Sequence, residues 1–167
     1  MNITIKEINN NDAEINLAKC FLFNQIKKVY GIGRNPKFHY DIDQLKEYYI
    51  LPSRNNFYVA WDGDNIVATA AVRAYDKDYE MFKGVYSNDD TASIWRLMVD
   101  EDYRRRGLAR NLVDVMEDFA RKKSYEKMYL HTHRYLDGAL SFWKSLGYEI
   151  TVEEDDYDET SHMIKNL

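Results

Sequence analysis

Hydrophobic and polar positions alternate in several short segments of the chain, and this pattern predicts strands. The first segment, Ile3–Ile8, alternates apolar and polar residues as a half-buried strand does. Two β-rich runs, Phe57–Trp61 and Ile66–Tyr75, flank the turn sequence DGDN and predict a hairpin. The run Ala92–Val99 is almost continuously apolar, which is typical of a central strand that is covered on both faces.

Other segments have the apolar spacing of helices. Asn11 is a good helix cap, and the residues after it carry a broad apolar stripe that ends near two glycines and Pro36. Cys20 lies in this apolar pattern, so we expect it to be a buried core thiol. Further helices are predicted at Asp41–Leu51 and Gly107–Lys123, and a short helix that is stopped by Gly147 is predicted in the sequence LDGALSFWKSLGY.

The order of these elements predicts an α/β fold. Lys127–His133 reads as a strand, and two last strands surround the acidic turn DDYDE near the end of the chain. The helix at Gly107–Lys123 joins two strands, so those strands should be parallel to each other. The remaining connections favour antiparallel pairs. Residues 76–91 are polar and irregular, and we expect them to form a surface excursion.

Composition narrows the class of protein. A chain of 167 residues suggests a single domain over residues 1–167. The net charge of −5 and pI of about 5.4 argue against general binding of nucleic acid, because an acidic surface repels phosphates. The single cysteine rules out an intrachain disulfide. The sequence has no signal peptide pattern and no apolar run of membrane-spanning length, so we expect a soluble, cytoplasmic protein with no membrane partner.

Positive charge is nevertheless concentrated in one place, between the predicted strand that ends at Val99 and the predicted helix at Gly107. The first turn of a helix has free backbone N–H groups and a partly positive dipole end, so it binds phosphate well. Gly107 allows a ligand to approach the backbone closely. The arginines of this loop and helix start are Arg104, Arg105, Arg106 and Arg110. The spacing differs from the ATP-type loop and predicts a site for one diphosphate.

The segment Arg104–Ala109 resembles the Arg/Gln-x-x-Gly-x-Gly/Ala motif of the GCN5-related N-acetyltransferases. The surroundings are similar too: RLMVDEDY precedes the motif, and GALSFWKSLGY follows about thirty residues later. The resemblance covers the whole chain in order and is strongest from Ala92 to Ile150. It implies a GNAT fold, with a mixed, mostly antiparallel central sheet splayed at two parallel strands and flanked by about four helices.

The resemblance also implies a cosubstrate, acetyl-CoA, and the residues that bind it. The loop amides and arginines would hold the diphosphate, and the strand backbone would pair with the pantetheine arm. The backbone N–H of Met98 would donate to the thioester oxygen, where negative charge develops. The residues expected to bind the cosubstrate are Leu97, Met98, Val99, Arg104, Arg105, Arg106, Gly107, Leu108, Ala109, Arg110 and Phe142.

The acid and base of the family do not transfer to this chain. Members of the family often carry a glutamate where this sequence has Ser93, and a tyrosine acid where it has Trp143. An asparagine that contacts the pantetheine aligns with Leu136. His131 and His133 lie two residues apart on one strand face, and His133 is our candidate base. Tyr135 or Tyr148 could protonate the departing thiolate, with Tyr135 as our candidate. Two further histidines and one cysteine do not suggest a metal site.

The resemblance thus predicts transfer of the acetyl group to a primary amine of a small molecule, polyamine or peptide. Aromatic side chains of the early helices and loops could shape the acceptor pocket: Tyr30, His39, Tyr40, Tyr48, Tyr49 and Tyr75. A non-catalytic acyl-CoA-binding or sensing module on the same fold is the alternative. A third hypothesis is an RNA-binding or different phosphate-binding protein that uses the arginine loop, and the acidic balance counts against it. The protein could form a homodimer.

Overall fold

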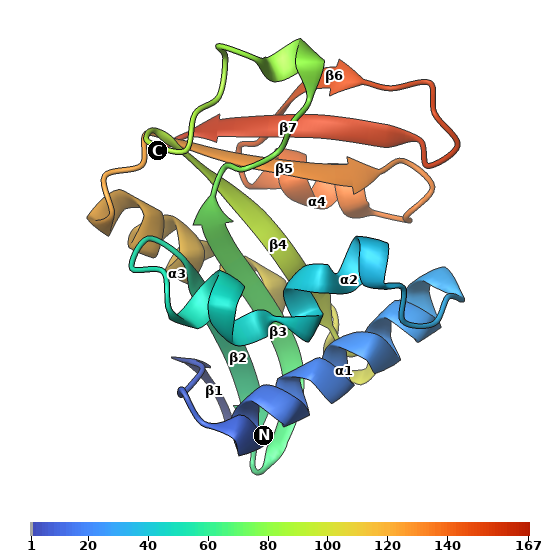
Figure 1. The fold of residues 1–167 in the computed structure, drawn as a ribbon. Helices are drawn as coiled ribbons and strands as arrows, with labels where there is room; N and C mark the ends of the chain where they lie inside the picture. The colour runs from blue at the N-terminus through green and yellow to red at the C-terminus, as the bar shows by residue number, and fades with distance from the viewer. Residues whose placement is uncertain (1) are drawn as a thin grey trace. The chain divides into compact units, whose positions relative to one another are not determined.

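The structure is a computed structural model that describes residues 2–167. Seven strands form one hydrogen-bonded sheet in the order β1-β2-β3-β4-β5-β7-β6. The pairs β1·β2, β2·β3, β5·β7 and β6·β7 are antiparallel, and β4·β5 is parallel. The predicted α/β fold with a mostly antiparallel sheet and one parallel pair is therefore confirmed (Figure 1).

The residues group into two compact units, and each is described by itself. The first unit contains Met1–Arg73 and Trp95–Met116, and the second contains Ala74–Ile94 and Glu117–Leu167. Both β4 (Thr91–Val99) and α3 (Leu108–Lys122) therefore contribute residues to each unit.

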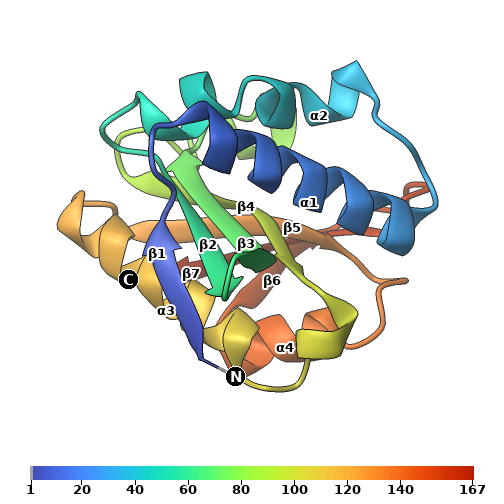
Figure 2. The same ribbon diagram turned by 90° about the horizontal axis from the view of Figure 1, so that it is seen from below.

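The first unit is built on the antiparallel strands β1 (Ile3–Glu7), β2 (Asn56–Asp62) and β3 (Asn65–Ala74). Helices α1 (Asp12–Tyr30) and α2 (Pro36–Asp43) lie on one face of these strands, and the first turns of α3 lie on the other (Figure 2). The core between α1, α2 and the strands contains Ile15, Leu22, Ile42, Phe57 and Val59. The predicted hairpin is confirmed.

Helix α1 begins as predicted, because the Asn11 side chain accepts a hydrogen bond from the N–H of Glu14. It ends at Gly31, which adopts the left-handed conformation that stops many helices. The prediction of a buried Cys20 is wrong, since this thiol is exposed. The buried face contains Ile15, Ala18, Leu22, Gln25 and Ile26, and Cys20 lies about 200° around the helix from Ala18.

The helix predicted at Asp41–Leu51 is wrong in its bounds. Instead, α2 runs from Pro36 to Asp43, and a separate π-helical turn follows at Lys46–Ile50. Asn35 caps α2 with its side chain, and proline is well tolerated in the first helical turn. Pro36 thus lies beyond the end of α1 and also begins α2, and the sequence pattern indicated only the first of these two roles.

The second unit is built on β5 (Lys127–His133), β6 (Glu149–Glu153) and β7 (Thr160–Asn166). The first residues of β4 join it, because Thr91, Ala92 and Ser93 pair in parallel with Lys127, Met128 and Tyr129. Helix α4 (Ala139–Ser145) lies against one face of this sheet.

The excursion at residues 76–91 covers the other face of the second unit. It contains a short 3₁₀ helix, Glu80–Phe82, and Phe82 is buried against Tyr129 and His162. The prediction of a polar surface loop therefore missed an anchored aromatic residue, because the few apolar side chains of this polar segment show no helical or strand periodicity.

Candidate functional site

The loop between β4 and α3 is fixed at its start within the first unit. The Asp100 carboxylate accepts hydrogen bonds from the side-chain amide of Gln25 at 2.8 Å and from the backbone N–H of Asp102 at 3.2 Å. The Tyr103 hydroxyl donates to Asp62 at 2.8 Å. These contacts tie the loop to α1 and to the end of β2, so the residues that follow start from a defined position.

The next residues form an exposed turn at the N-terminus of α3. Arg104, Arg105 and Arg106 are all exposed, and Arg105 has a positive φ of 58°. Gly107 has a φ of 78°, and a Cβ at this position would meet no atom within 4 Å. The N-terminus of α3 is therefore open, with space beside the backbone of Gly107. Leu108 is buried and anchors the start of the helix in the core.

The electrostatics at the N-terminus of α3 favour the binding of an anion. The first helical hydrogen bond runs from the Asn111 N–H to the Gly107 carbonyl at 3.0 Å, so the N–H groups before Asn111 make no hydrogen bond within the helix. The first turn of α3 contains no acidic residue, although acidic side chains are commonly found there. The Arg110 side chain, in the first turn of α3, is exposed as well. One anionic group could be held by backbone N–H groups and guanidinium groups together.

The second half of β4 leads directly into this loop. Leu97, Met98 and Val99 are half-buried, and the Met98 side chain packs against the core of the first unit. Arg96 immediately precedes them and has a φ of 50°, which is unusual inside a strand. The three residues expected to face the pantetheine arm thus follow a distortion of the strand.

A buried charged cluster next to β4 was not found from the sequence. The guanidinium of Arg96 binds the Asp41 carboxylate through two contacts, Nε–Oδ2 at 3.0 Å and Nη2–Oδ1 at 2.6 Å. The Tyr49 hydroxyl donates to the same carboxylate at 2.6 Å. Burial alone would raise the pKa of Asp41, but the hydrogen bonds and charge of Arg96, with the Tyr49 bond, lower it overall. Asp41 is therefore ionised in the core.

Arg73 on β3 lies in the same part of the first unit. Its guanidinium carbon is 3.7 Å from the ring centroid of Trp95, and its Nη2 donates to the Tyr40 hydroxyl at 2.9 Å. Arg73 is only 1% exposed. A signal for both arginines exists in the sequence, because each is the lone charged residue in an otherwise apolar strand run.

The second unit places the candidate base in a defined orientation. His133 Nδ1 lies 2.8 Å from the backbone carbonyl oxygen of Asp158. A carbonyl oxygen can only accept, so Nδ1 carries the hydrogen of this bond. In the neutral imidazole, the lone pair is then on Nε2, which is the nitrogen able to take a proton.

Tyr135 lies beside His133, with its ring stacked on the imidazole at a centroid distance of 5.4 Å. The Tyr135 side chain is half-exposed, and partial burial followed by the nearby Asp158 carboxylate raises its pKa. The phenol is therefore protonated at neutral pH and could give up a proton. His131 is on the same strand face, 5.8 Å from His133 between ring centroids.

The remaining predicted residues of the second unit are mainly core residues. Trp143 is buried and packs edge-on against Tyr148 and Phe142, at 5.2 Å and 5.0 Å. The Tyr148 hydroxyl donates to the buried carboxylate of Glu117 at 3.0 Å. Phe142 is half-buried. The Tyr148 hydroxyl is thus engaged in a hydrogen bond in the core, which favours Tyr135 as the candidate acid.

Ser93, at the position where the sequence resemblance implies a glutamate, is completely buried. Its hydroxyl oxygen has no hydrogen-bond partner among the described residues. A buried serine cannot supply the carboxylate chemistry of a general base. Of the aromatic residues expected around the acceptor, His39 and Tyr49 are buried in the first unit and Tyr75 in the second.

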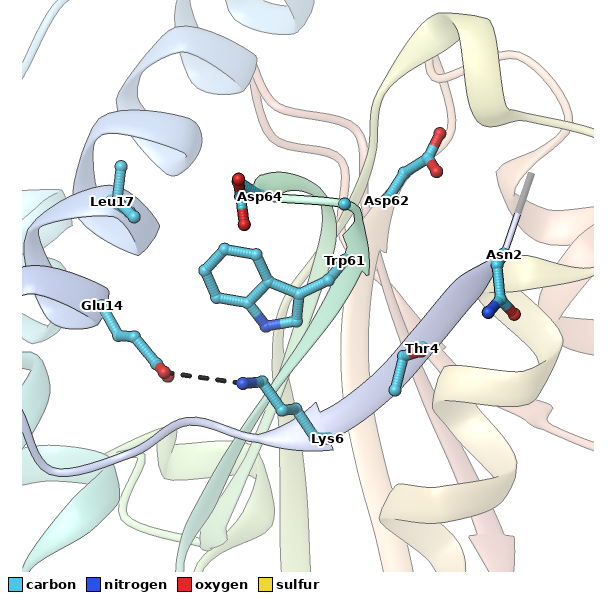
Figure 3. Close-up of a pocket in the computed structure, with 9 residues that line it drawn as sticks. Asn2, Thr4, Lys6, Glu14, Leu17, Trp61, Asp62 and Asp64 are labelled. Atoms are coloured by element: carbon cyan, nitrogen blue, oxygen red, sulfur yellow. Dashed lines mark ion pairs between the residues drawn. The ribbon is translucent and has the colours of Figure 1, made fainter.

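An open hollow of about 670 Å³ lies elsewhere on the first unit (Figure 3). Trp61 lies at its centre, and an ion pair between Lys6 and Glu14 at 3.5 Å closes one side. None of the residues predicted to bind acetyl-CoA lines it. In residues 2–167, no group of three or more metal-ligating side chains is found, and no helix is long and apolar enough to span a membrane.

The sequence model of the acetyltransferase (GNAT) family matches residues 21–148. The chain belongs to this family. The match covers the arginine loop, α3, β5 and α4, which are the elements described above. This GNAT chain also resembles solved structures over its whole length. An acetyltransferase from Streptococcus agalactiae has a TM-score of 0.78 at 19% identity and covers 99% of this chain and 98% of its own.

A PaiA N-acetyltransferase from Thermoplasma acidophilum, solved in complex with coenzyme A, has a TM-score of 0.70 at 17% identity, with both chains fully covered. Among curated relatives, the probable N-acetyltransferase 14 of Xenopus tropicalis is 27% identical over 111 residues, or 66% of this chain. The human N-acetylaspartate synthetase is 28% identical over 131 residues, or 78% of this chain. This GNAT chain spans 48% and 40% of the lengths of these two relatives.

Proposed function

We propose that this GNAT chain is an acetyl-CoA-dependent N-acetyltransferase that acts on a primary amine. The proposal rests on the open, positively charged N-terminus of α3, which is formed by Arg104–Ala109 in a chain of this family. Space beside Gly107, exposed guanidinium groups and a first turn without acidic side chains fit a diphosphate.

In this proposal, the first unit binds the cosubstrate. Backbone N–H groups of Arg106–Ala109 hold the diphosphate, with Arg104, Arg105 and Arg110 adding charge around it. The backbone of Leu97–Val99 pairs with the pantetheine arm in the manner of an added strand. The Met98 N–H donates to the thioester oxygen, where negative charge grows during the reaction.

Acetyl-CoA supplies an acetyl group activated as a thioester. The amine nitrogen forms the new bond to the acetyl carbon while the bond from that carbon to sulfur breaks. An alkylamine with a pKa of about 10.4 is mostly protonated at pH 7, so a base must first remove a proton. We assign this role to His133, directly or through water, because its Nδ1–H is held by the Asp158 carbonyl and Nε2 carries the lone pair.

As the amide forms, the nitrogen loses its second proton to solvent, and the thiolate that leaves must gain one. We assign this step to Tyr135, because its raised pKa keeps the phenol protonated and its side chain is half-exposed. Tyr148 is a weaker candidate, since its hydroxyl is committed to Glu117 in the core.

The acceptor class is a small-molecule amine, a polyamine or a peptide amine. A thiol-release assay with acetyl-CoA and a panel of aspartate, spermidine and a short peptide tests the reaction. Release of free CoA that depends on one amine, with the acetylated product found by mass spectrometry, is expected. We also propose that the protein can form a homodimer. Light scattering of the purified protein measures its oligomeric state.

A non-catalytic acyl-CoA-binding or sensing module is the second candidate. The observation that favours it is the burial of Ser93 and Trp143, at the positions where the family resemblance implies a glutamate and a tyrosine acid. Tight acetyl-CoA binding without turnover over a wide amine panel would support this second candidate. Absence of acetyl-CoA binding in calorimetry would overturn both candidates.

A further inference from the structure

The open hollow around Trp61 is lined by none of the residues that we assign to the proposed reaction. Its volume of about 670 Å³ lies within the range of sites that hold small molecules. The walls come from β1, from α1 and from the turn between β2 and β3 (Figure 3). All of these elements belong to the first unit, so one compact part of the chain forms the whole hollow.

Negative charge dominates the walls of the hollow. The charged residues that line it are Lys6, Glu14, Asp62 and Asp64. The ion pair between Lys6 and Glu14 at 3.5 Å offsets two of these charges and leaves the two aspartates. The Asp62 carboxylate accepts a hydrogen bond from the Tyr103 hydroxyl at 2.8 Å, and a carboxylate has room for further donors. Asp64 is exposed. The hollow therefore has two negative charges in excess, both at the hairpin turn.

The surface between these charges is apolar and attracts cations. The Lys6 Nζ lies 5.1 Å from the centroid of the Trp61 ring, which is a cation–π contact. In Figure 3, the Trp61 ring lies between the Lys6–Glu14 ion pair and the Asp64 carboxylate. Leu17 on α1 is 49% exposed and adds apolar surface. A Cβ at Gly63, which separates the two aspartates, would meet no atom within 4 Å, so the space beside the turn is open.

We propose that this hollow is a binding site for a small aliphatic diamine. Alkylamines have a pKa of about 10.4 and are charged at pH 7, so a diamine carries two positive charges that match the two in excess on the walls. Its ammonium groups donate to the carboxylates of Asp62 and Asp64. Its hydrocarbon chain lies along the open side of Gly63 and against Trp61. The inference goes beyond the proposed function and does not depend on acetyl transfer, because the site shares no residue with it.

Nuclear magnetic resonance of the full chain tests the site through the indole N–H of Trp61. The ring lies in the hollow, so this resonance reports on a molecule bound there (Figure 3). The Trp61→Phe variant identifies the signal, because its spectrum lacks that signal alone. Titration with 1,4-diaminobutane should shift the signal to saturation with a Kd on the order of 1 mM, as an open site with few contacts gives. Succinate, which has the same chain length and the opposite charge, should not shift it. Sodium chloride at equal ionic strength should not shift it either.

Two charge-changing variants should act in opposite directions. Asp64→Asn keeps the shape of the side chain and removes its charge, so the diamine should bind about fivefold more weakly. Lys6→Gln removes an ammonium group that repels the ligand, so the diamine should bind about threefold more tightly. Asp155→Asn removes an exposed carboxylate of the second unit and should leave the Kd unchanged. All three side chains are exposed, so we expect the variants to fold, and circular dichroism checks this.

A Trp61 signal that stays in place, or that moves equally with sodium chloride, would overturn the inference. Equal diamine affinities of Asp64→Asn and Asp155→Asn would also refute it, since the position of the charge would then be irrelevant. Weaker binding in Lys6→Gln would contradict a cation site. Failure of the proposed function is a separate result, because a wild type that binds no acetyl-CoA would still show the Trp61 titration. Gly107→Glu should likewise bind the diamine as the wild type does.

Discussion

At the scale of single residues, Gly107 shows how backbone conformation and ligand space combine. Its φ of 78° disfavours any residue with a Cβ, while the space beside it is open. The sequence suggested that glycine is needed so that a ligand can approach, and the structure adds that glycine is needed for the turn itself. The positive φ of Arg105, two residues earlier, is a second conformational cost in the same loop.

Gly107→Ala is therefore expected to weaken acetyl-CoA binding by about tenfold, because a left-handed alanine costs on the order of 1 kcal/mol or more. Gly107→Glu should bind still more weakly, since its carboxylate would repel the diphosphate. Gly84→Ala is the matched control, because Gly84 also has a φ of 75° and open space but lies outside the loop. Its acetyl-CoA affinity should equal that of the wild type. Unchanged affinity in Gly107→Glu would contradict the assignment of the site.

His133 is the residue on which the proposed chemistry depends most. His133→Ala should lower kcat by about a hundredfold, which is the size of effect that general base catalysis provides. The Kd of acetyl-CoA should change little, because the cosubstrate is expected to bind through the first unit. His131→Ala serves as the comparison on the same strand face. Steady-state kinetics with a saturating amine measure both, and an unchanged kcat in His133→Ala would remove this residue as the base.

Tyr135 gives a prediction on pH. Its pKa is raised above the ordinary value of 10.0 by partial burial and by Asp158, so the phenol stays protonated through neutral pH and past pH 10. An acid that must be protonated loses its function as pH rises through its pKa. The wild-type kcat should thus hold up to about pH 10 and fall above it. Tyr135→Phe should have a lower kcat without this alkaline fall, and a profile identical to the wild type would exclude Tyr135.

At the scale of elements, the parallel pair of β4 and β5 begins at a small polar junction. The Asp90 carbonyl accepts from the N–H groups of Glu126 and Lys127, at 2.8 Å and 3.1 Å. The Asp90 carboxylate accepts from the Thr91 hydroxyl at 2.6 Å and pairs with the Lys127 ammonium at 3.3 Å. A residue of the segment that we expected to form only a surface excursion thus fastens two strands.

These contacts lower the pKa of Asp90 from 3.8 to about 2, with the Thr91 hydrogen bond as the largest favourable cause. Because the folded pKa is depressed, this carboxylate stabilises the fold above pH 3.8, and its contribution is lost as pH falls through about 2. Asp90→Asn should thus be less stable than the wild type at pH 7, and the difference should vanish near pH 2. Urea unfolding at the two pH values measures it, with Asp155→Asn as an exposed control. A difference that persists at pH 2 would refute the carboxylate role.

At the scale of the whole molecule, ligand binding should be visible as stability. A ligand that binds only the folded state at about 100 times its Kd adds about 2.7 kcal/mol to the free energy of unfolding. For a chain of this length, that corresponds to a rise in melting temperature of about 5–10 °C. We expect this rise with acetyl-CoA in differential scanning calorimetry and a smaller one with ADP. The Gly107→Glu variant should show neither, and an equal rise in that variant would place the ligand elsewhere.

Much of the fold follows from local patterns. The strand at Lys127–His133 has the predicted bounds, and the hairpin, the Asn11 cap and the parallel pair are confirmed. Alternation and apolar spacing are properties of neighbouring residues, so they can be read directly from the sequence. The motif Arg104–Ala109 is equally local, which is why the sequence alone indicates the family.

The tertiary structure alone decided which groups meet. Asp41 and Arg96 are separated by 55 positions, and neither belongs to a motif that would pair them. The exposure of Cys20, the burial of Phe82 and the bond from His133 to the Asp158 carbonyl are likewise set by packing between distant segments. Sequence by itself determined the family, the order of the main elements and the position of the arginine loop. Only the fold determined the pairing of Asp41 with Arg96 and the tautomer of the candidate base, because long-range contacts leave no periodic pattern along the chain.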